Sequence, residues 1–222
     1  MLLPRPLRLP AAVLLAVCVA VTVLFAILFA GHTQPSRLDA AVDPALQHSL
    51  GRVIVLLNVS DVAGTLIPVS LMTLALTVAC LAIRRWSGAV LALVATPAAS
   101  VLTKFVLKPL VDRTIRGDLT FPSGHATGMF ALAATCAVLL VDPPGHRVSA
   151  AVRLLLASLA LLLATTVSLA MVARLSHYLT DAMAGAAVGT GVVLACALTL
   201  DWGARLRSRP AAVPGGRSRR CG

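Results

Sequence analysis

The sequence has little charge and contains no glutamate. Only 12% of its 222 residues are charged and 59% are hydrophobic, whereas charged residues make up about 25% of a typical soluble domain. A soluble globular fold is therefore excluded, and lipid must be the solvent for most of the chain. The 8 acidic residues, all aspartates, form no group with the spacing of metal ligands, so we expect no metal and no other cofactor.

The sequence also lacks paired cysteines. Its 5 cysteines stand singly, mostly within apolar runs, a distribution typical of small core residues rather than of a metal motif or a disulfide framework. The formal net charge of +11 would favour nucleic acid as the partner of a soluble protein. In a membrane protein, basic residues set topology and contact lipid headgroups instead, so we expect the bilayer as partner and no nucleic acid.

The sequence contains long apolar runs. A helix that crosses about 30 Å of hydrocarbon needs about 20 apolar residues, and the sequence predicts such helices at 11–30, 62–83, 87–107, 123–141, 154–173 and 182–200. The first run is longer than the apolar core of a signal peptide, which favours a retained helix. We therefore expect an all-α bundle of six transmembrane helices, one integral membrane domain over 1–203, and a basic, disordered cytoplasmic tail over 204–222.

Six spans put both chain termini on one side of the membrane. Twelve basic residues fall on that side: Arg5, Arg8, Arg84, Arg85, Arg147, Arg153, Arg205, Arg207, Arg209, Arg217, Arg219 and Arg220. The positive-inside rule then makes it cytoplasmic and predicts a multi-pass protein of the cell membrane. Gly185 and Gly189 form a GxxxG pair that we expect to mediate packing within the bundle. The composition does not specify an oligomeric state.

The same topology brings three polar segments to the extracytoplasmic side. One of them, Pro122-Ser123-Gly124-His125, has the order of a helix start, with Ser123 as N-cap and Gly124 permitting close approach. The free N–H groups of such a helix start bind oxyanions, and His125 one turn inside can donate a proton to a leaving oxygen. The alternative is a plain N-cap followed by an unrelated histidine.

A second segment carries His177 and Asp181, four residues apart. On a helix this spacing lets the carboxylate accept the Nδ1–H of the imidazole, which leaves Nε2 free as a nucleophile and stabilises the cation formed on attack. We therefore predict His177 as nucleophile, oriented by Asp181, and His125 as general acid. The alternative is a surface capping pair.

Basic residues near these segments are candidates for binding phosphate. Arg113 and Arg174 offer a bidentate guanidinium and Lys108 a point charge, and Arg116 remains an alternative to Arg113. Snorkelling to the interface is the other role open to such residues, and we assign it to Lys104. Without a metal, these cations must neutralise the phosphate charge.

These motifs resemble those of the type 2 phosphatidic acid phosphatase (PAP2) superfamily, written K-x6-RP, PSGH and SR-x5-H-x3-D. The resemblance covers most of 60–200, with PSGH unaltered at 122–125 and H-x3-D at His177 and Asp181. In the first motif Lys108 to Arg113 is two residues short, Lys108 to Arg116 is one residue long, and Gly117 replaces the expected proline. The choice between Arg113 and Arg116 therefore stays open, and we prefer Arg113. In the third motif Met171 occupies the arginine position, and Arg174 stands three residues before the histidine.

The resemblance implies a PAP2-like bundle that hydrolyses a membrane lipid phosphomonoester or diphosphate, such as phosphatidic acid, phosphatidylglycerol phosphate or a polyprenyl phosphate or diphosphate. It implies a phosphohistidine at His177, with the phosphate bound by Lys108, Arg113, Ser123, Gly124 and Arg174. Two other hypotheses remain: a non-catalytic protein that binds anionic lipid, and a transporter. Lys104 is the only charged residue expected within a span, which disfavours the transporter.

Overall fold

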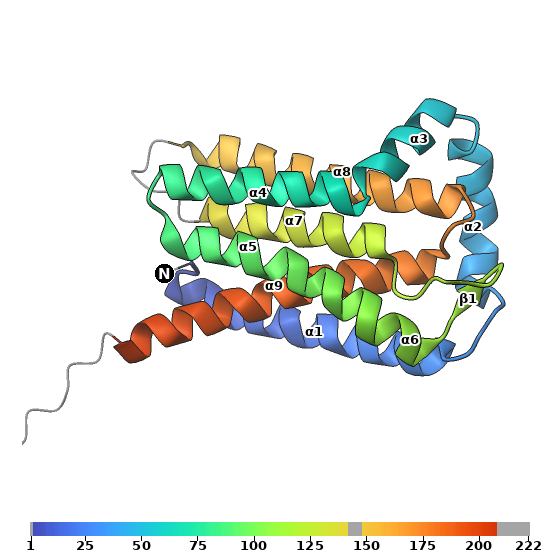
Figure 1. Cartoon of the computed structure of the whole chain (residues 1–222), viewed down its shortest axis with the longest axis horizontal. Coiled ribbons are helices and arrows are strands. Elements are labelled where there is room, and N and C mark those ends of the chain that lie inside the picture. The colour runs from blue at the N-terminus through green and yellow to red at the C-terminus, as the bar shows by residue number, and fades with distance from the viewer. Residues whose placement is uncertain (1, 142–147, 208–222) are drawn as a thin grey trace, which may run out of the picture.

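The computed structural model describes residues 2–141 and 148–207, which form a bundle of roughly parallel and antiparallel helices (Figure 1). In chain order the elements are α1 (Arg5–Phe29), α2 (Arg37–Leu50), α3 (Ile54–Ala63), α4 (Leu66–Ala82), α5 (Trp86–Val101), the π-helix η1 (Leu102–Leu107), α6 (Lys108–Val111), the strands β1 (Thr114–Ile115) and β2 (Asp118–Leu119), α7 (Gly124–Val141), α8 (Ala150–Ala173) and α9 (Leu179–Arg207). The predicted all-α class is confirmed.

The helices are long and apolar enough for a membrane protein. Five of them qualify as spans: α1, the continuous α5–η1–α6 helix over Trp86–Val111, α7, α8 and α9. The count rises to six if α3 and α4, which meet at a bend of 61°, are taken as one span. The expected helix over 62–83 is thus broken near Gly64, and α3 leans away from the bundle (Figure 1).

Other boundaries also differ from those expected: α1 begins at Arg5 rather than at residue 11, and α8 begins at Ala150 rather than at residue 154. The polar stretch after α1 contains the 14-residue helix α2, which begins at a capping box in which Ser36 and Asp39 bond each other's backbone N–H. Such a box supplies acceptors at a helix start even where the sequence is polar and contains a proline. At the other terminus α9 continues to Arg207 rather than ending at residue 200, and the rest of the expected tail lies outside the described residues.

α7 lies at the centre of the bundle and packs most extensively against α9. The GxxxG pair forms this contact, because a Cβ at Gly185 would lie 2.5 Å from the Ser123 carbonyl oxygen, and one at Gly189 would lie 2.4 Å from that of Thr127. These glycines therefore let the two backbones touch, as expected for packing within the bundle. The contact fixes the start of α9 beside the start of α7.

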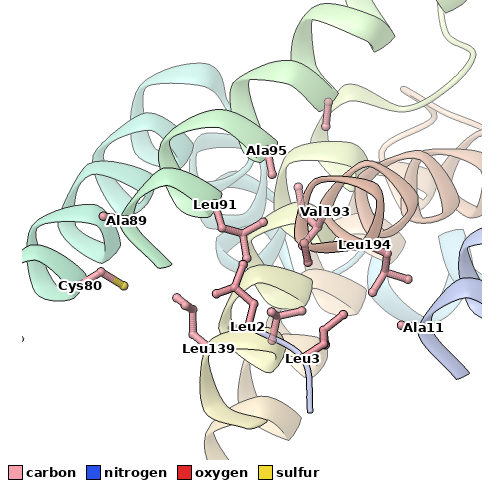
Figure 2. Close-up of a cluster of buried hydrophobic side chains, with 14 residues drawn as sticks. Leu2, Leu3, Ala11, Cys80, Ala89, Leu91, Ala95, Leu139, Val193 and Leu194 are labelled. Carbon is pink, nitrogen blue, oxygen red and sulfur yellow. The ribbon is translucent and has the colours of Figure 1, made fainter. Parts of the chain in front are cut away.

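The first described residues and the end of α9 lie at the same end of the bundle (Figure 1), and Leu2 and Leu3 are buried there. Leu2 and Leu3 insert among α5, α7 and α9 (Figure 2), and their N–H groups donate to the Asp201 carboxylate at 2.6 and 2.8 Å. At this end Arg85 and Arg153 donate to carbonyl groups of the last turn of α7, which a helix C-terminus favours. The opposite end, formed by α2, α3, α6 and the β-hairpin, carries the candidate site (Figure 1).

Candidate active site

A cavity of about 440 Å³ opens at the end of the bundle opposite the termini. Its lining combines apolar side chains of α4 with polar groups of the α5–η1–α6 helix, of α7 and of the loop before α9: Gly64, Thr65, Leu66, Val69, Ser100, Thr103, Lys104, Lys108, Gly124, His125, Gly128 and His177. Four of the predicted site residues, Lys108, Gly124, His125 and His177, therefore share one cavity. They come from three separate parts of the chain.

The two predicted histidines face each other at this cavity. Their ring centroids are 6.3 Å apart at an interplanar angle of 61°. His125 lies in the first turn of α7, where Ser123 caps the helix by accepting the Ala126 N–H at 3.4 Å. Helix geometry leaves the N–H groups of this first turn without intrahelical acceptors. The start of α7 thus presents a histidine and main-chain donors at one place.

The backbone of α3 holds the His125 ring. Its Nε2 lies 3.2 Å from the Asp61 carbonyl oxygen and 3.6 Å from the Asp61 carboxylate. Because a carbonyl oxygen only accepts, Nε2 donates and carries a hydrogen. A Cβ at Gly64 would lie 2.4 Å from the ring, so the break between α3 and α4 needs glycine for this close approach. Sequence reasoning missed Asp61 and Gly64, because neither residue belongs to a local motif.

His177 is 9% exposed and its Nδ1 has no hydrogen-bond partner among the described residues. Burial lowers the pKa of His177 to about 3, assisted by the positive charge of Lys108 and by His125, while a hydrogen bond to the Thr120 backbone opposes the shift. The imidazole is therefore neutral at physiological pH, with a lone pair available. A buried nitrogen without a partner costs free energy, and a catalytic role is one reason for such an atom to persist in a native structure.

The predicted pairing of His177 with Asp181 is wrong. Asp181 accepts instead from Arg113 at 2.6 Å and from the Tyr178 N–H at 3.1 Å. The physical reason is that α9 begins at Leu179, so His177 precedes the helix and does not share a helical face with Asp181. The carboxylate therefore caps the start of α9 and cannot orient the histidine directly.

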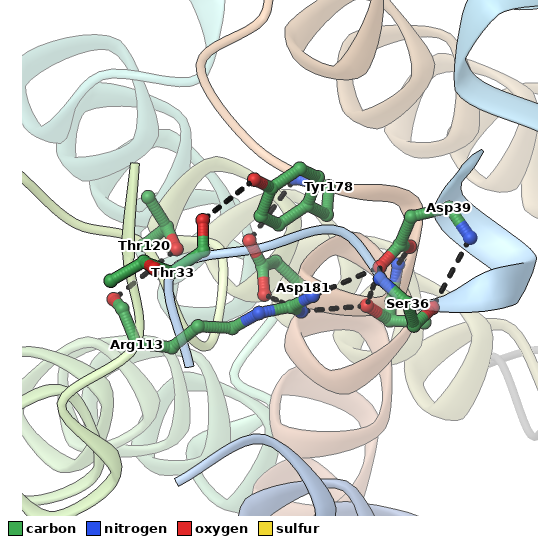
Figure 3. Close-up of polar contacts among 8 residues, drawn as sticks. Thr33, Ser36, Asp39, Arg113, Thr120, Tyr178 and Asp181 are labelled. Atoms are coloured by element: carbon green, nitrogen blue, oxygen red, sulfur yellow. Dashed lines mark hydrogen bonds and ion pairs between the residues drawn. The ribbon is translucent and has the colours of Figure 1, made fainter. Parts of the chain in front are cut away.

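Arg113, predicted to bind phosphate, is fully buried in a cluster away from solvent (Figure 3). Besides Asp181, it donates to the Asp39 carboxylate at 2.9 Å, and its guanidinium carbon lies 4.3 and 4.4 Å from the ring centroids of Phe29 and Tyr178. Two carboxylates and two aromatic rings thus surround the cation, and of its nitrogen atoms Nε alone has no partner among the described residues. Arg113 has no guanidinium face left for a phosphate.

Asp39 also binds the loop that carries His177. Its carboxylate accepts the N–H and the hydroxyl of Thr180 at 2.9 and 3.0 Å. Burial alone would raise the pKa of Asp39, but hydrogen bonds from the Thr180 and Ser36 backbone and from Arg113 outweigh it and lower the pKa. The carboxylate is therefore ionised, and α2 is joined through it to the start of α9.

The remaining predicted phosphate ligands also lie elsewhere. The Ser123 side chain is fully buried as the cap of α7. Arg174 is exposed and donates to Asn58 Oδ1 at 2.9 Å, with a second contact of 3.6 Å to Asp61. Arg116 is exposed in the turn of the β-hairpin, with a positive φ of 54°. Arg174 and Arg116 therefore do not line the cavity, as side chains that bind phosphate there would.

Lys104 was expected to snorkel but lines the cavity together with Lys108. The π-helix η1 explains this placement, because the Lys108 N–H bonds the Thr103 carbonyl five residues back. A five-residue turn brings positions 103, 104 and 108 round to one side of the helix, and such π-turns are frequent at functional sites. Lys108 in turn donates to the Leu119 carbonyl of the hairpin.

Asp43 on α2 is a titratable group beside the Arg113 cluster. Burial raises its pKa to about 6, assisted by the charges of Asp39 and Asp181, and its Oδ1 has no partner among the described residues. Because the folded-state pKa lies above the unfolded value of about 3.9, folding favours the protonated carboxyl. The stability contributed by this preference is complete below about pH 4 and is lost as the pH rises through about 6.

Replacing Asp43 with asparagine should therefore raise the thermal midpoint by several degrees at pH 8 and by clearly less at pH 5. Asparagine resembles the protonated carboxyl and does not ionise, so it removes the cost of a buried charge at high pH. The measurement is thermal unfolding of the detergent-solubilised protein at both pH values. Asp118→Asn, at an exposed hairpin position, is the control. An equal gain at both pH values would contradict the assignment.

The model of the PAP2 superfamily matches residues 89–204, just over half of the chain. The matched range contains Lys108, the Pro122–His125 segment and His177, whereas Asp39 and Asp61 precede it. No curated protein and no solved structure gives a match.

Proposed function

The chain belongs to the PAP2 superfamily, whose members are phosphatases, and we propose that it hydrolyses a membrane lipid phosphomonoester or diphosphate through a phosphohistidine, without a metal. One observation carries this proposal: His125, in the first turn of α7, and His177, in the loop before α9, flank a single cavity that Lys108 and Gly124 also line. Two imidazoles on either side of one phosphorus atom can act as nucleophile and as proton donor.

In the proposed first step a ring nitrogen of neutral His177 attacks the phosphorus atom. The P–O bond to the leaving group breaks, its electron pair goes to the leaving oxygen, and His125 supplies a proton to that oxygen. In the second step a water molecule gives a proton to His125 and attacks the phosphohistidine, which breaks the P–N bond and releases inorganic phosphate. Since Nε2 of His125 donates to the Asp61 carbonyl, Nδ1 is the nitrogen that exchanges protons.

Lys108 and the main-chain N–H groups at the start of α7 stabilise the charge on the phosphoryl oxygens. Lys108 is a point charge, and the Gly124 amide is an oriented dipole that needs no reorganisation during the reaction. In place of the arginine clamp expected from the motifs, the proposal uses Lys108 and Gly124 as the phosphate-binding set. Arg113, with Asp39 and Asp181, acts as a support for the loop that carries His177.

A lipid substrate fits the position of the cavity. Leu66 and Val69 of α4 form an apolar wall beside the polar groups of the α5–η1–α6 helix, so a headgroup can reach the histidines while its tails stay in the bilayer. The start of α1, the end of α9 and the turn between α4 and α5, which contains Arg84 and Arg85, lie at the other end of the bundle (Figure 1). With the basic end cytoplasmic, the site belongs to the extracytoplasmic side of the cell membrane.

The purified protein should release inorganic phosphate from lipid phosphates in the presence of EDTA. The substrate panel is phosphatidic acid, phosphatidylglycerol phosphate, and a polyprenyl phosphate and diphosphate, each in mixed micelles. The activity does not depend on a metal because the protein's own cations neutralise the phosphate. Lipid binding without phosphate release from any of the four would instead support the non-catalytic alternative and overturn the proposal.

A further inference from the structure

The two lysines of the chain lie together at the site. Of 19 basic residues, 17 are arginines, and the two lysines, Lys104 and Lys108, both line the cavity. Elsewhere the chain uses arginine wherever a cation faces the membrane interface or caps a helix. A compact, strongly hydrated ammonium differs from a planar guanidinium, so the exclusive use of lysine at the cavity points to a ligand and not to the interface.

Lys104 has no role in the architecture of the bundle. Among residues 2–141 and 148–207 its side chain makes no hydrogen bond or ion pair, and Nζ lies 5.6 Å from the centroid of the Phe105 ring. It stands within the Trp86–Val111 span, where a charged side chain is costly and usually functional. Its charge also repels that of Lys108. An anion bound between the two ammonium groups would relieve that repulsion.

The spacing of the lysines suits two linked phosphates. Lys104 precedes Lys108 by four residues, so it lies about one turn further along the helix, away from the hairpin and toward the membrane interior. Lys108 is the lysine held to the hairpin through Leu119. A phosphate at Lys108 is therefore the outer one, and a phosphate at Lys104 is the one nearer to the lipid tail.

We infer that Lys104 binds the inner, lipid-linked phosphate of a lipid diphosphate while the outer phosphate is held by Lys108 and attacked by His177. This inference rests on the proposed function and names its preferred substrate class. The N–P bond forms at the outer phosphorus, the P–O bond to the bridging oxygen breaks, and that oxygen leaves with the electron pair on the lipid monophosphate. Lys104 neutralises the charge that develops on this leaving group; His125 protonates it, and water then releases inorganic phosphate.

Kinetics on matched lipids test the inference. Lys104→Met should lower kcat/KM for a polyprenyl diphosphate about 10- to 100-fold, the loss of one charge-assisted contact in the transition state, and should change kcat/KM for the monophosphate with the same tail much less. Lys104→Arg, which keeps the charge but replaces the compact ammonium with a guanidinium, should lose less diphosphate activity than Lys104→Met but should not reach the wild-type rate. Arg52→Ala, which removes an exposed cation at the same end of the bundle, is the control and should leave both substrates unaffected. Equal losses on both lipids, or no loss on either, would overturn the inference.

A second measurement does not depend on turnover. Because the chain has two lysines, amine acylation followed by mass spectrometry reports each of them separately. Inorganic pyrophosphate should protect Lys104 and Lys108 of the detergent-solubilised protein, whereas inorganic phosphate should protect mainly Lys108. If pyrophosphate leaves Lys104 as reactive as phosphate does, the inference fails even where hydrolysis is observed. If the protection is seen without hydrolysis, the diphosphate site stands and the proposed catalysis fails.

Discussion

His177→Ala should abolish phosphate release, with a fall in kcat of ~10³-fold or more, because no other group can form the covalent intermediate. The substitution removes a buried neutral imidazole whose Nδ1 has no partner, so its cost in hydrogen bonding is limited to the bond with the Thr120 backbone. Thermal unfolding should therefore change far less than activity. The measurement is phosphate release from the four lipids under substrate saturation.

His32→Ala is the matched control, since His32 is an exposed histidine after α1 whose Nδ1 contacts only the nearby Ala30 carbonyl. It should retain full activity. Brief incubation of the wild-type protein with a radiolabelled lipid phosphate should also yield a labelled protein whose label is stable in base and lost in acid, as a phosphoramidate bond is. Full activity of His177→Ala would falsify the nucleophile assignment, and labelled protein from His177→Ala would place the intermediate on another residue.

The bundle was largely predictable because lipid imposes one simple rule on a spanning segment. Every backbone polar group must be satisfied within the helix, so about 20 uninterrupted apolar residues identify a span without any knowledge of its neighbours. This rule does not identify α2. Its sequence is polar and includes Pro44, and its stability comes from the Ser36–Asp39 capping box and from Asp39 reaching the start of α9. Neither feature produces a periodic pattern of apolar residues from which a helix could be predicted.

The site was predictable to the extent that its chemistry resides in local motifs. The Pro122–His125 segment, His177 and Lys108 were found from residue type and spacing, and they share one cavity. The partner of Asp181 was not found, because i, i+4 pairing presumes a helix that already includes His177, and α9 starts two residues later. Arg113 pairs with Asp39 across 74 positions, and a single sequence carries no signal for contacts at that separation.

Lys104 illustrates a different limit. A lysine near the end of a span can always snorkel to the interface. The side of the helix on which its side chain lies depends on the helical winding, which the sequence does not show. The π-turn between Thr103 and Lys108 shifts the winding by part of a turn and brings Lys104 to the cavity. One signal was nevertheless present in the sequence: a chain that otherwise uses arginine at every basic position has lysine at these two places only.

Arg113→Ala should be the most destabilising single substitution at this end of the bundle, lowering stability by about 3–5 kcal/mol because it leaves two buried carboxylates without their cation. Asp39 and Asp181 are each fully buried, so water cannot replace the guanidinium. Thermal unfolding in detergent should show a fall of roughly 10 °C or more. The unfolding midpoint of Arg113→Lys should lie between those of the wild-type protein and Arg113→Ala. An ammonium keeps the charge but cannot donate to both carboxylates in the same geometry.

Arg116→Ala, three residues further along the same hairpin and exposed, is the matched control and should change stability by less than about 0.5 kcal/mol. The comparison separates two roles for Arg113. If Arg113 binds the phosphate of the substrate, its removal raises KM. The unfolding midpoint then stays nearly unchanged, because the phosphate is absent from the free protein. A buried support lowers the midpoint in the free protein and lowers activity only through the position of His177. Arg113→Ala could instead keep the wild-type midpoint and lose only affinity for the lipid. In that case the ion-paired cluster does not hold the loop, and Arg113 is a phosphate-binding residue.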